Sequence, residues 1–249
     1  MTGILADTYS VLWSDLRFLW RNWRRILITS LISPVLYLAA FGWGLGRNIT
    51  VEGSSYLEFV IPGIIALTAM NSSFNGAGMK LNVDRLFYKC FDECLMSPIR
   101  PVSLILGKAL AGMLRGLISS LAFLIIGFII ASSMTVNALF ALALILTCLT
   151  FAFLGVLAAL LARSHQDMAT FSTLVMLPMT FLGGTFFSLG QLPPFLKIII
   201  SFIPLTHSSQ CLRAAALGQP FPWLSLLAVT VFGLAFFAGC MLAVRRSSL

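Results

Sequence analysis

The sequence predicts an all-α membrane protein with six transmembrane helices in a single domain over residues 1–249. Of its 249 residues, 59% are hydrophobic and 10% are charged, whereas soluble domains carry about 25% charged residues. The mean hydropathy of +0.99 agrees. A chain this apolar could not cover a surface that faces water, so lipid must be its solvent. Six spans of about 20 residues leave little of the chain for a second domain.

Residues 3–24 precede the first apolar run and have an amphipathic pattern. Polar side chains recur at spacings of three and four, and apolar side chains recur at the same spacings on another face. The indole rings of this segment suit the headgroup zone: Trp13, Trp20 and Trp23. Its last basic residues are Arg17, Arg21, Arg24 and Arg25. The pattern predicts a helix that lies in the cytoplasmic interface of the membrane.

Six apolar segments follow this helix. They predict spans at residues 26–46, 57–79, 104–131, 138–162, 169–189 and 222–244. With the N-terminus inside, thirteen Lys and Arg residues fall on the inner side and three on the outer side, so both termini are expected in the cytoplasm. The net charge of +8 is then a topogenic charge with lipid headgroups as its partners, and we expect no nucleic acid partner.

The connection between the second and third spans is long enough to hold a further element. Residues 84–99 have an apolar side and a charged side, and Pro98 ends the helix that this pattern predicts. Such a helix could lie in the membrane interface or dock a cytosolic partner. The paired acids Asp92 and Glu93 favour docking, because an anionic membrane surface would repel them.

The outer connection before the last span holds two short helical segments. Residues 191–218 contain an apolar stretch of about ten residues and then a second stretch that ends at Gly218. Both are too short to span, which predicts two re-entrant or interfacial helices. They could gate the outer mouth or form a surface cap, and the pattern does not separate these readings.

Motifs for chemistry are sparse. Gly107-Lys108 lacks the other residues of a phosphate-binding loop, and the five cysteines lack the spacing of a zinc site. We therefore expect no enzyme activity, cofactor or metal in this chain. His165 and Asp167 are the only candidates for a lipid-modifying enzyme, although a solvated loop explains them more simply. The central parts of the spans contain no Asp, Glu, Lys or Arg, and Arg115 lies within the first few turns of the third span. This scarcity of buried charge argues against ion coupling.

Three stretches carry a resemblance to a known family. The first is Phe59-Val60-Ile61-Pro62-Gly63-Ile64. The second is Phe91-Asp92-Glu93-Cys94-Leu95-Met96-Ser97-Pro98-Ile99, followed by Gly107-Lys108. The third is Phe181-Leu182-Gly183-Gly184-Thr185-Phe186-Phe187-Ser188, followed by Leu192-Pro193, Pro204-Leu205-Thr206-His207 and Arg213. Over essentially its whole length the chain resembles the membrane subunit of type-two ABC exporters, a group with permeases for O-antigen, nodulation lipo-oligosaccharides and hydrophobic drugs.

The resemblance implies a permease of the bacterial inner membrane that exports an amphipathic or lipid-linked substrate, such as a glycolipid, a polysaccharide or a hydrophobic drug. It implies a homodimer with two copies of a cytosolic ATPase subunit, which would hold ATP and Mg. Residues 84–99 would be the coupling helix that docks in the ATPase. The docking residues would be Arg85, Lys89, Phe91, Asp92, Glu93, Leu95, Met96, Ser97 and Pro98.

Polar and aromatic residues of the second and fifth spans and the outer loop are candidates for the pathway or its gate. They are Asn71, Ser72, Asn75, Phe181, Phe186, Phe187 and His207. The polar residues of the second span could line a path or simply bond between helices. The alternatives to an exporter are a passive channel or secondary transporter and, more remotely, a lipid-modifying membrane enzyme.

Overall fold

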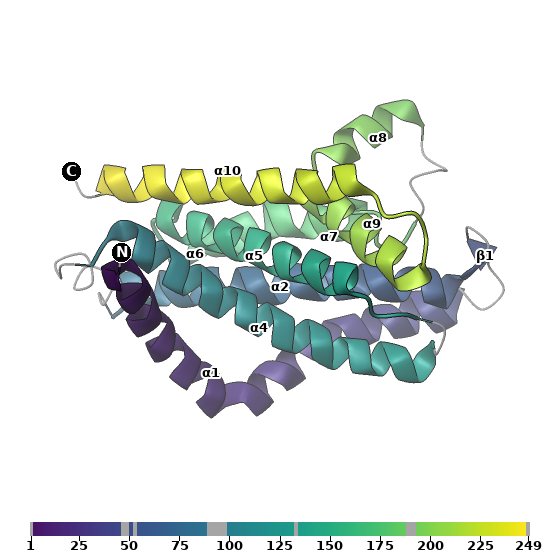
Figure 1. Ribbon diagram of the computed structural model, residues 1–249, viewed down its shortest axis with the longest axis horizontal. Coiled ribbons are helices and arrows are strands. Elements are labelled where there is room, and N and C mark those ends of the chain that lie inside the picture. Colours follow the sequence, from purple (N-terminus) through teal and green to yellow (C-terminus); the bar gives the residue numbers. More distant parts are fainter. Residues whose placement is uncertain are drawn as a thin grey trace.

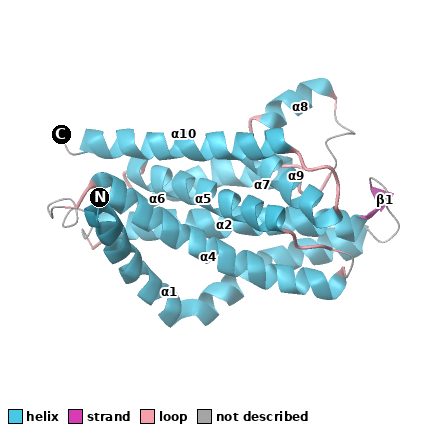
Figure 2. Ribbon diagram, viewed as in Figure 1, coloured by secondary structure: helices cyan, strands magenta, loops and turns pink. Residues whose placement is uncertain are grey.

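The computed structural model describes residues 2–45, 50–51, 54–88, 99–131, 134–187 and 193–247. In chain order its elements are α1 (Thr2–Tyr37), the π-helix η1 (Leu38–Leu45), β1 (Thr50–Val51), β2 (Ser54–Ser55), α2 (Tyr56–Leu86), α4 (Pro101–Ile130), α5 (Ala138–Leu161), α6 (His165–Phe171), the π-helix η2 (Ser172–Met176), α7 (Leu177–Leu182), α8 (Pro194–Ser201), α9 (Pro204–Leu217) and α10 (Trp223–Ser247). The two strands form one antiparallel pair. Helices dominate the described chain (Figure 2).

Five of the described helices are long and apolar enough to cross a membrane. They are α1 with part of η1, α2, α4, α5 and α10. The number rises to six if α8 and α9, which are bent by 91° at a short break, count as one broken span. The predicted all-helical membrane fold is confirmed. The predicted outer segment 191–218 holds these two short helices, and their re-entrant placement stays a prediction.

The predicted fifth span, residues 169–189, differs in detail from the structure. Here α6, η2 and α7 follow one another without a gap from His165 to Leu182, and residues 183–187 are not helical. Pro178 accounts for the π turn, because proline lacks an N–H and its ring collides with the carbonyl four residues earlier. The Leu177 N–H bonds instead to Ser172, five residues back. The helix therefore ends earlier than predicted; residues 188–189 lie outside the described ranges.

The predicted interface helix (3–24) and first span (26–46) are not separated by a break in the helix. α1 is one helix through both segments, and Figure 1 shows it bending at the bottom of the view rather than breaking. Arg24 and Arg25 mark a change of environment, but charge does not interrupt the backbone hydrogen bonds of a helix. Neither Gly nor Pro lies near them to do so.

The second span is also longer than predicted. α2 continues to Leu86, seven residues past the predicted end at 79. The start of the predicted coupling helix, residues 84–86, is thus the end of α2. Residues 89–98 of that predicted helix lie outside the described ranges.

α2 lies at the centre of the bundle, and glycines bring its neighbours close. In its most apolar window 83% of the residues are buried, against 22% in α1 and α10. A Cβ added at Gly116 of α4 would lie 1.9 Å from the Ser73 Oγ, and one added at Gly155 of α5 would lie 2.5 Å from the Phe74 carbonyl oxygen. A Cβ added at Gly112 of α4 would also lie 2.6 Å from the Ala77 Cβ. Gly112 and Gly116, which have the small-xxx-small spacing, therefore form a helix-packing surface.

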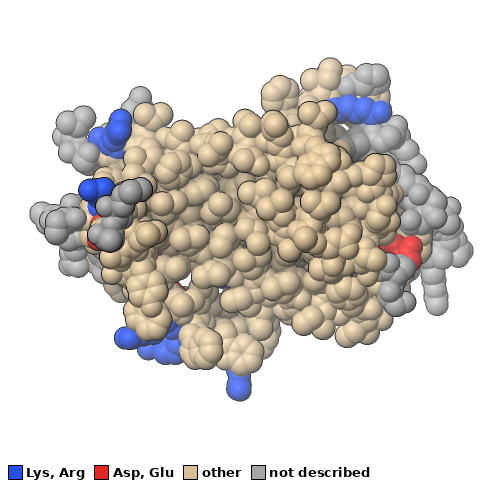
Figure 3. Space-filling model, viewed as in Figure 1, with Lys and Arg blue, Asp and Glu red and all other residues tan. Residues whose placement is uncertain are grey.

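Charged residues gather at the ends of the molecule. Both termini lie at the same end in Figure 1, and in Figure 3 the Lys and Arg side chains group mostly at that end and along the N-terminal arm of α1. Uncharged residues fill the broad band between the two ends (Figure 3). This is the distribution expected of a protein with lipid around its middle.

Candidate functional site

The loop at residues 183–187 is held by a buried cation of α9. The Arg213 Nε donates to the Phe59 carbonyl oxygen at 3.1 Å, and its Nη2 donates to the Gly184 carbonyl oxygen at 2.9 Å. The guanidinium carbon lies 3.6 Å from the centroid of the Phe59 ring. Arg213 is only 7% exposed. A planar, permanently charged donor thus joins the start of α2 to the loop that follows α7.

Small residues let the same loop approach α2. A Cβ added at Gly63 would lie 2.8 Å from the Thr185 carbonyl oxygen, so only glycine fits there. Gly184 has a φ of 67°, in the left-handed region that favours glycine. The Tyr56 hydroxyl donates to the Phe186 carbonyl oxygen at 2.9 Å. The first and third stretches of the resemblance, more than 100 residues apart in sequence, therefore form one packed unit.

The four predicted gate residues beyond α2 lie in different settings. Phe186 is buried by stacking on Phe41, with the ring centroids 4.3 Å apart. Phe181 lines a cavity, and Phe187 is half-buried outside it. The His207 Nε2 lies 2.8 Å from the Ser201 carbonyl oxygen, so the imidazole joins α9 to the end of α8. The Phe181 and Phe186 rings approach one another, with their centroids 6.4 Å apart, whereas His207 lies at the contact between α9 and α8.

A polar cavity of about 660 Å³ lies between α1, α2 and the η2–α7 segment. Its wall includes hydroxyl groups from all three, among them Ser33, Thr68 and Thr180. Of the predicted pathway residues, the ones that line it are Asn71, Ser72, Asn75 and Phe181. The Asn71 and Asn75 amide nitrogens donate to carbonyls one turn back along α2, at 3.2 and 2.9 Å. Their pathway role stays a prediction, but the structure does gather them on one wall.

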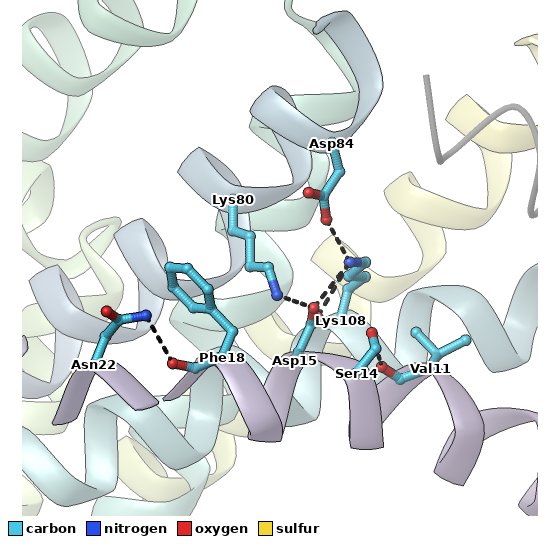
Figure 4. A network of polar contacts seen from close by, with 8 residues as sticks. All are labelled: Val11, Ser14, Asp15, Phe18, Asn22, Lys80, Asp84 and Lys108. Atoms are coloured by element: carbon cyan, nitrogen blue, oxygen red, sulfur yellow. Dashed lines mark hydrogen bonds and ion pairs between the residues drawn. The ribbon is translucent and has the colours of Figure 1, made fainter. Parts of the chain in front are cut away.

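A network of four charges fastens the N-terminal arm of α1 to the bundle (Figure 4). The Asp15 carboxylate pairs with Lys80 of α2 and, at 3.1 Å, with Lys108 of α4. Lys108 also pairs with Asp84 at 2.7 Å. The Asp15 side chain is only 3% exposed. Two acids and two bases balance one another here, and each buried charge has a partner.

This network was not predicted from the sequence, although the sequence contains one sign of it. Val11, Asp15 and Leu19 are spaced by four and share a helix face, and all three are buried. An acid on the apolar face of an amphipathic helix needs a buried basic partner. The Lys80 Nζ also lies 4.8 Å from the centroid of the Phe18 ring, which adds a cation–π contact.

The basic residues predicted for the membrane interface are all exposed on the N-terminal arm. They are Arg17, Arg21, Arg24 and Arg25. The Arg24 guanidinium lies 5.4 Å from the Trp23 ring centroid. This placement leaves their side chains open to headgroups, and the interfacial role itself stays a prediction.

In the described part of the predicted coupling segment, Arg85 hydrogen-bonds to another helix of the same chain. The Arg85 Nη1 donates to the carbonyl oxygens of Ala159, Leu160 and Ala162 at 2.9, 2.8 and 3.1 Å. These are carbonyls at the end of α5, which lack partners in their own helix. Arg85 therefore caps α5 and has fewer donors to offer a partner. The other predicted docking residues, 89–98, lie outside the described ranges.

The residues proposed for an alternative enzyme have structural partners. The Asp167 Oδ2 accepts from the backbone N–H groups of Arg163 and Ser164 at 2.8 and 3.1 Å. The Arg163 N–H in the first place, then the Ser164 hydroxyl, lower the pKa of this carboxyl group. His165 contacts the Asn82 side chain. Among the described residues no group of His, Cys, Asp or Glu side chains could hold a metal ion.

Comparison with known proteins identifies the family. A family model described as ABC-2 type transporter matches residues 7–217. The chain belongs to the ABC-2 type transporter family. Its ABC-2 relatives include the inner membrane transport permease YadH of Escherichia coli strain K12, which is 29% identical over 257 residues, 94% of this chain and 96% of YadH.

Other ABC-2 relatives match a shorter part of the chain. Nodulation protein J of Rhizobium leguminosarum bv. viciae is 29% identical over 211 residues, 81% of this chain and 82% of that protein. Nodulation protein J of Rhizobium meliloti strain 1021 is 28% identical over 211 residues, 81% of this chain and 80% of that protein. Together with the family match, these relatives support the role of an ABC transporter permease for this multi-pass membrane protein.

Proposed function

We propose that this chain is the permease subunit of an ATP-driven exporter in the bacterial inner membrane. Its cargo is an amphipathic or lipid-linked molecule, and a separate ATPase subunit supplies the energy, as is general in the ABC-2 family. The polar cavity between α1, α2 and the η2–α7 segment carries the proposal. It offers polar partners to a polar head group in a molecule whose middle is uncharged on the face shown in Figure 3.

We further propose a homodimer with two ATPase copies. Large apolar side chains are exposed beside the polar cavity on both of its outer walls: Ile32 (53%) and Leu36 (61%) on α1, and Leu174 (70%) and Leu177 (53%) on η2 and α7. A second copy packed on these walls would cover the apolar rims and enclose the cavity. Both termini and the basic end of the chain would face the cytoplasm.

The charge pattern favours an external energy source over a channel or an ion-coupled carrier. Carriers use intramembrane acids or histidines as relays. Among the described residues, the acids near the bundle interior, Asp15 and Asp84, are bound in salt bridges. Flux through liposomes that contain the chain without an ATPase would restore the channel reading. Loss of function in His165→Ala would restore the enzyme reading.

The docking assignment is tested by reversing two charges, Asp92→Arg with Glu93→Arg. We expect the double variant to lose stoichiometric co-purification of the ATPase subunit in mild detergent, because like charges across a contact cost several kcal/mol. The measurement is quantitative mass spectrometry of the purified complex. Asp7→Arg, a reversal on the N-terminal arm, is the control and should keep the ATPase. Undiminished co-purification in the double variant would show that the coupling segment does not dock through these acids.

A further inference from the structure

Arg115 is a partly buried cation within the third predicted span, where its sequence position indicated only one of the inner-side charges. It lies midway along α4, seven residues past Lys108, or about 10 Å further along the helix. Its stem packs against α2 at a glycine, since a Cβ added at Gly76 would lie 2.9 Å from the Arg115 Cδ. A longer residue than glycine at that position would displace the stem.

The charge of Arg115 is not balanced within the described part of the chain. The salt bridges there join Asp15 and Asp84 to Lys80 and Lys108, and none includes Arg115. Asp15 shares a small cavity with Arg115, but its carboxylate already binds both lysines. The Arg115 Nε is buried and has no hydrogen-bond partner among these residues. Two acids and two lysines cancel, so the local site keeps one positive charge.

Two cavities of opposite character meet at Arg115. One is the polar cavity of about 660 Å³ described above. The other has a volume of about 420 Å³ and lies between the N-terminal arm of α1 and α4. Apart from Arg115, its lining is apolar: Leu16, Leu19, Trp20, Trp23, Ile26 and Ile118. Both volumes lie in the range of small-molecule sites.

We infer that Arg115 binds the anionic head of a membrane amphiphile whose hydrocarbon chain lies in the apolar cavity between α1 and α4. A guanidinium suits phosphate because its donors form a planar fork. The indoles of Trp20 and Trp23 suit the boundary between headgroup and chain. The site's remaining positive charge selects an anionic lipid over a zwitterionic one. That this amphiphile is the cargo, waiting beside the polar cavity, rests on the proposed function.

The two tryptophans of the apolar cavity allow a direct test. In a variant with Trp13→Phe, Trp43→Phe and Trp223→Phe, the remaining tryptophans of the chain are Trp20 and Trp23. Their fluorescence would be measured in lipid nanodiscs with rising fractions of brominated phosphatidylglycerol or brominated phosphatidylcholine. We expect phosphatidylglycerol to quench at a lower fraction than phosphatidylcholine. Arg115 should account for about a fivefold share of this preference, the effect of one positive charge, and the exposed arginines of the arm for the rest.

Matched variants separate the site from general surface charge. Arg115→Gln should remove this fivefold share, and Arg115→Lys should keep part of it. Arg100→Gln, at an exposed position that starts α4, should leave the preference unchanged. Ile118→Phe should weaken quenching by filling the apolar cavity; Ile118 is 43% exposed, so this variant should fold even if Arg115→Gln does not. Equal quenching by the two lipids, or a full preference in Arg115→Gln, would overturn the inference.

The source of the anion is tested in the same sample. Inorganic phosphate, compared with sodium chloride at equal ionic strength, should not relieve the quenching, because it lacks the hydrocarbon chain. Relief by inorganic phosphate would show a site for free anions and overturn the lipid assignment. The assay needs no ATPase, so a lipid preference without ATPase co-purification would contradict only the proposed function, whereas the reverse result would contradict only the lipid site.

Discussion

Arg213 shows how much one buried side chain can organise. It touches the Phe59 ring and the carbonyls of Phe59 and Gly184. Arg213 is one of the three basic residues that the predicted topology places on the outer side, yet its side chain is almost completely buried from solvent. It is therefore better understood as an internal cross-link between α2, α9 and the 183–187 loop than as a topogenic charge.

Arg213→Lys keeps the charge but loses the fork of donors. We expect it to lower the free energy of unfolding by about 2–3 kcal/mol, because carbonyls in a buried site lose charged hydrogen bonds. Thermal unfolding in mild detergent, followed by intrinsic fluorescence, measures the change. Arg163→Gln, which removes an exposed cation, should shift stability by less than about 0.5 kcal/mol. Similar shifts in both variants would show that the cross-link contributes little.

Sequence reasoning reached some of these residues and missed others for physical reasons. Gly63 and Gly184 belong to recognisable stretches, but only the folded chain shows that they meet across the loop. Asp15 was given no role, and Arg115 was counted only as an inner-side charge, because hydropathy averages a window and one charge in an apolar run scarcely changes it. What decides their roles is the partner each one has or lacks, and partners come from distant segments.

At the scale of elements, the Asp15 network decides where the arm of α1 sits. Its partners come from α2 and α4, so three helices are joined at one carboxylate (Figure 4). Without this link, the arm would rely on the Ser103 hydroxyl, which donates to the Ile4 carbonyl oxygen at 3.3 Å, and on apolar contacts. One of these is Val11 over Gly107, since a Cβ added at Gly107 would lie 2.7 Å from the Val11 Cβ.

A double-mutant cycle tests this link. Asp15→Asn should destabilise the protein by about 1–3 kcal/mol, because Lys80 loses its carboxylate partner and Lys108 keeps only Asp84. Combining it with Lys80→Met should cost less than the sum of the two single changes, by about 1–3 kcal/mol. Unfolding in detergent measures each variant, with Asp7→Asn as the control. Additive losses would contradict a direct pairing of Asp15 with Lys80.

Element boundaries were the weakest part of the sequence predictions. Hydropathy located the spans, because burying about 20 apolar residues in lipid is what defines them. It could not detect that α1 continues through Arg24, because helix continuity depends on backbone bonding. It also placed the end of the fifth span too late, since apolar residues such as Phe186 pack inside the molecule beyond the last helical turn.

At the scale of the whole molecule, the arrangement of charge predicts its orientation. The N-terminal arm of α1, which contains Arg17, starts at the end with the termini, and α8, which contains Lys197, lies toward the other end (Figure 1). After Cys90→Ser and Cys94→Ser, with Cys148, Cys211 and Cys240 buried, new cysteines can report on each side. We expect Arg17→Cys to react with an impermeant maleimide only in opened cells, and Lys197→Cys to react in intact cells. Reaction of both in intact cells would contradict the assigned orientation.

The continuity of α1 gives the molecule a lever. Asp15 is the pivot, clamped to α2 and α4, and Ser33 further along the same helix is part of the polar cavity's wall. A flexible loop between Asp15 and Ser33 would absorb a displacement, whereas a continuous helix transmits it. A displacement of the basic end of the bundle would thus be transmitted along α1 to the wall of the polar cavity, where the polar head of a cargo would bind.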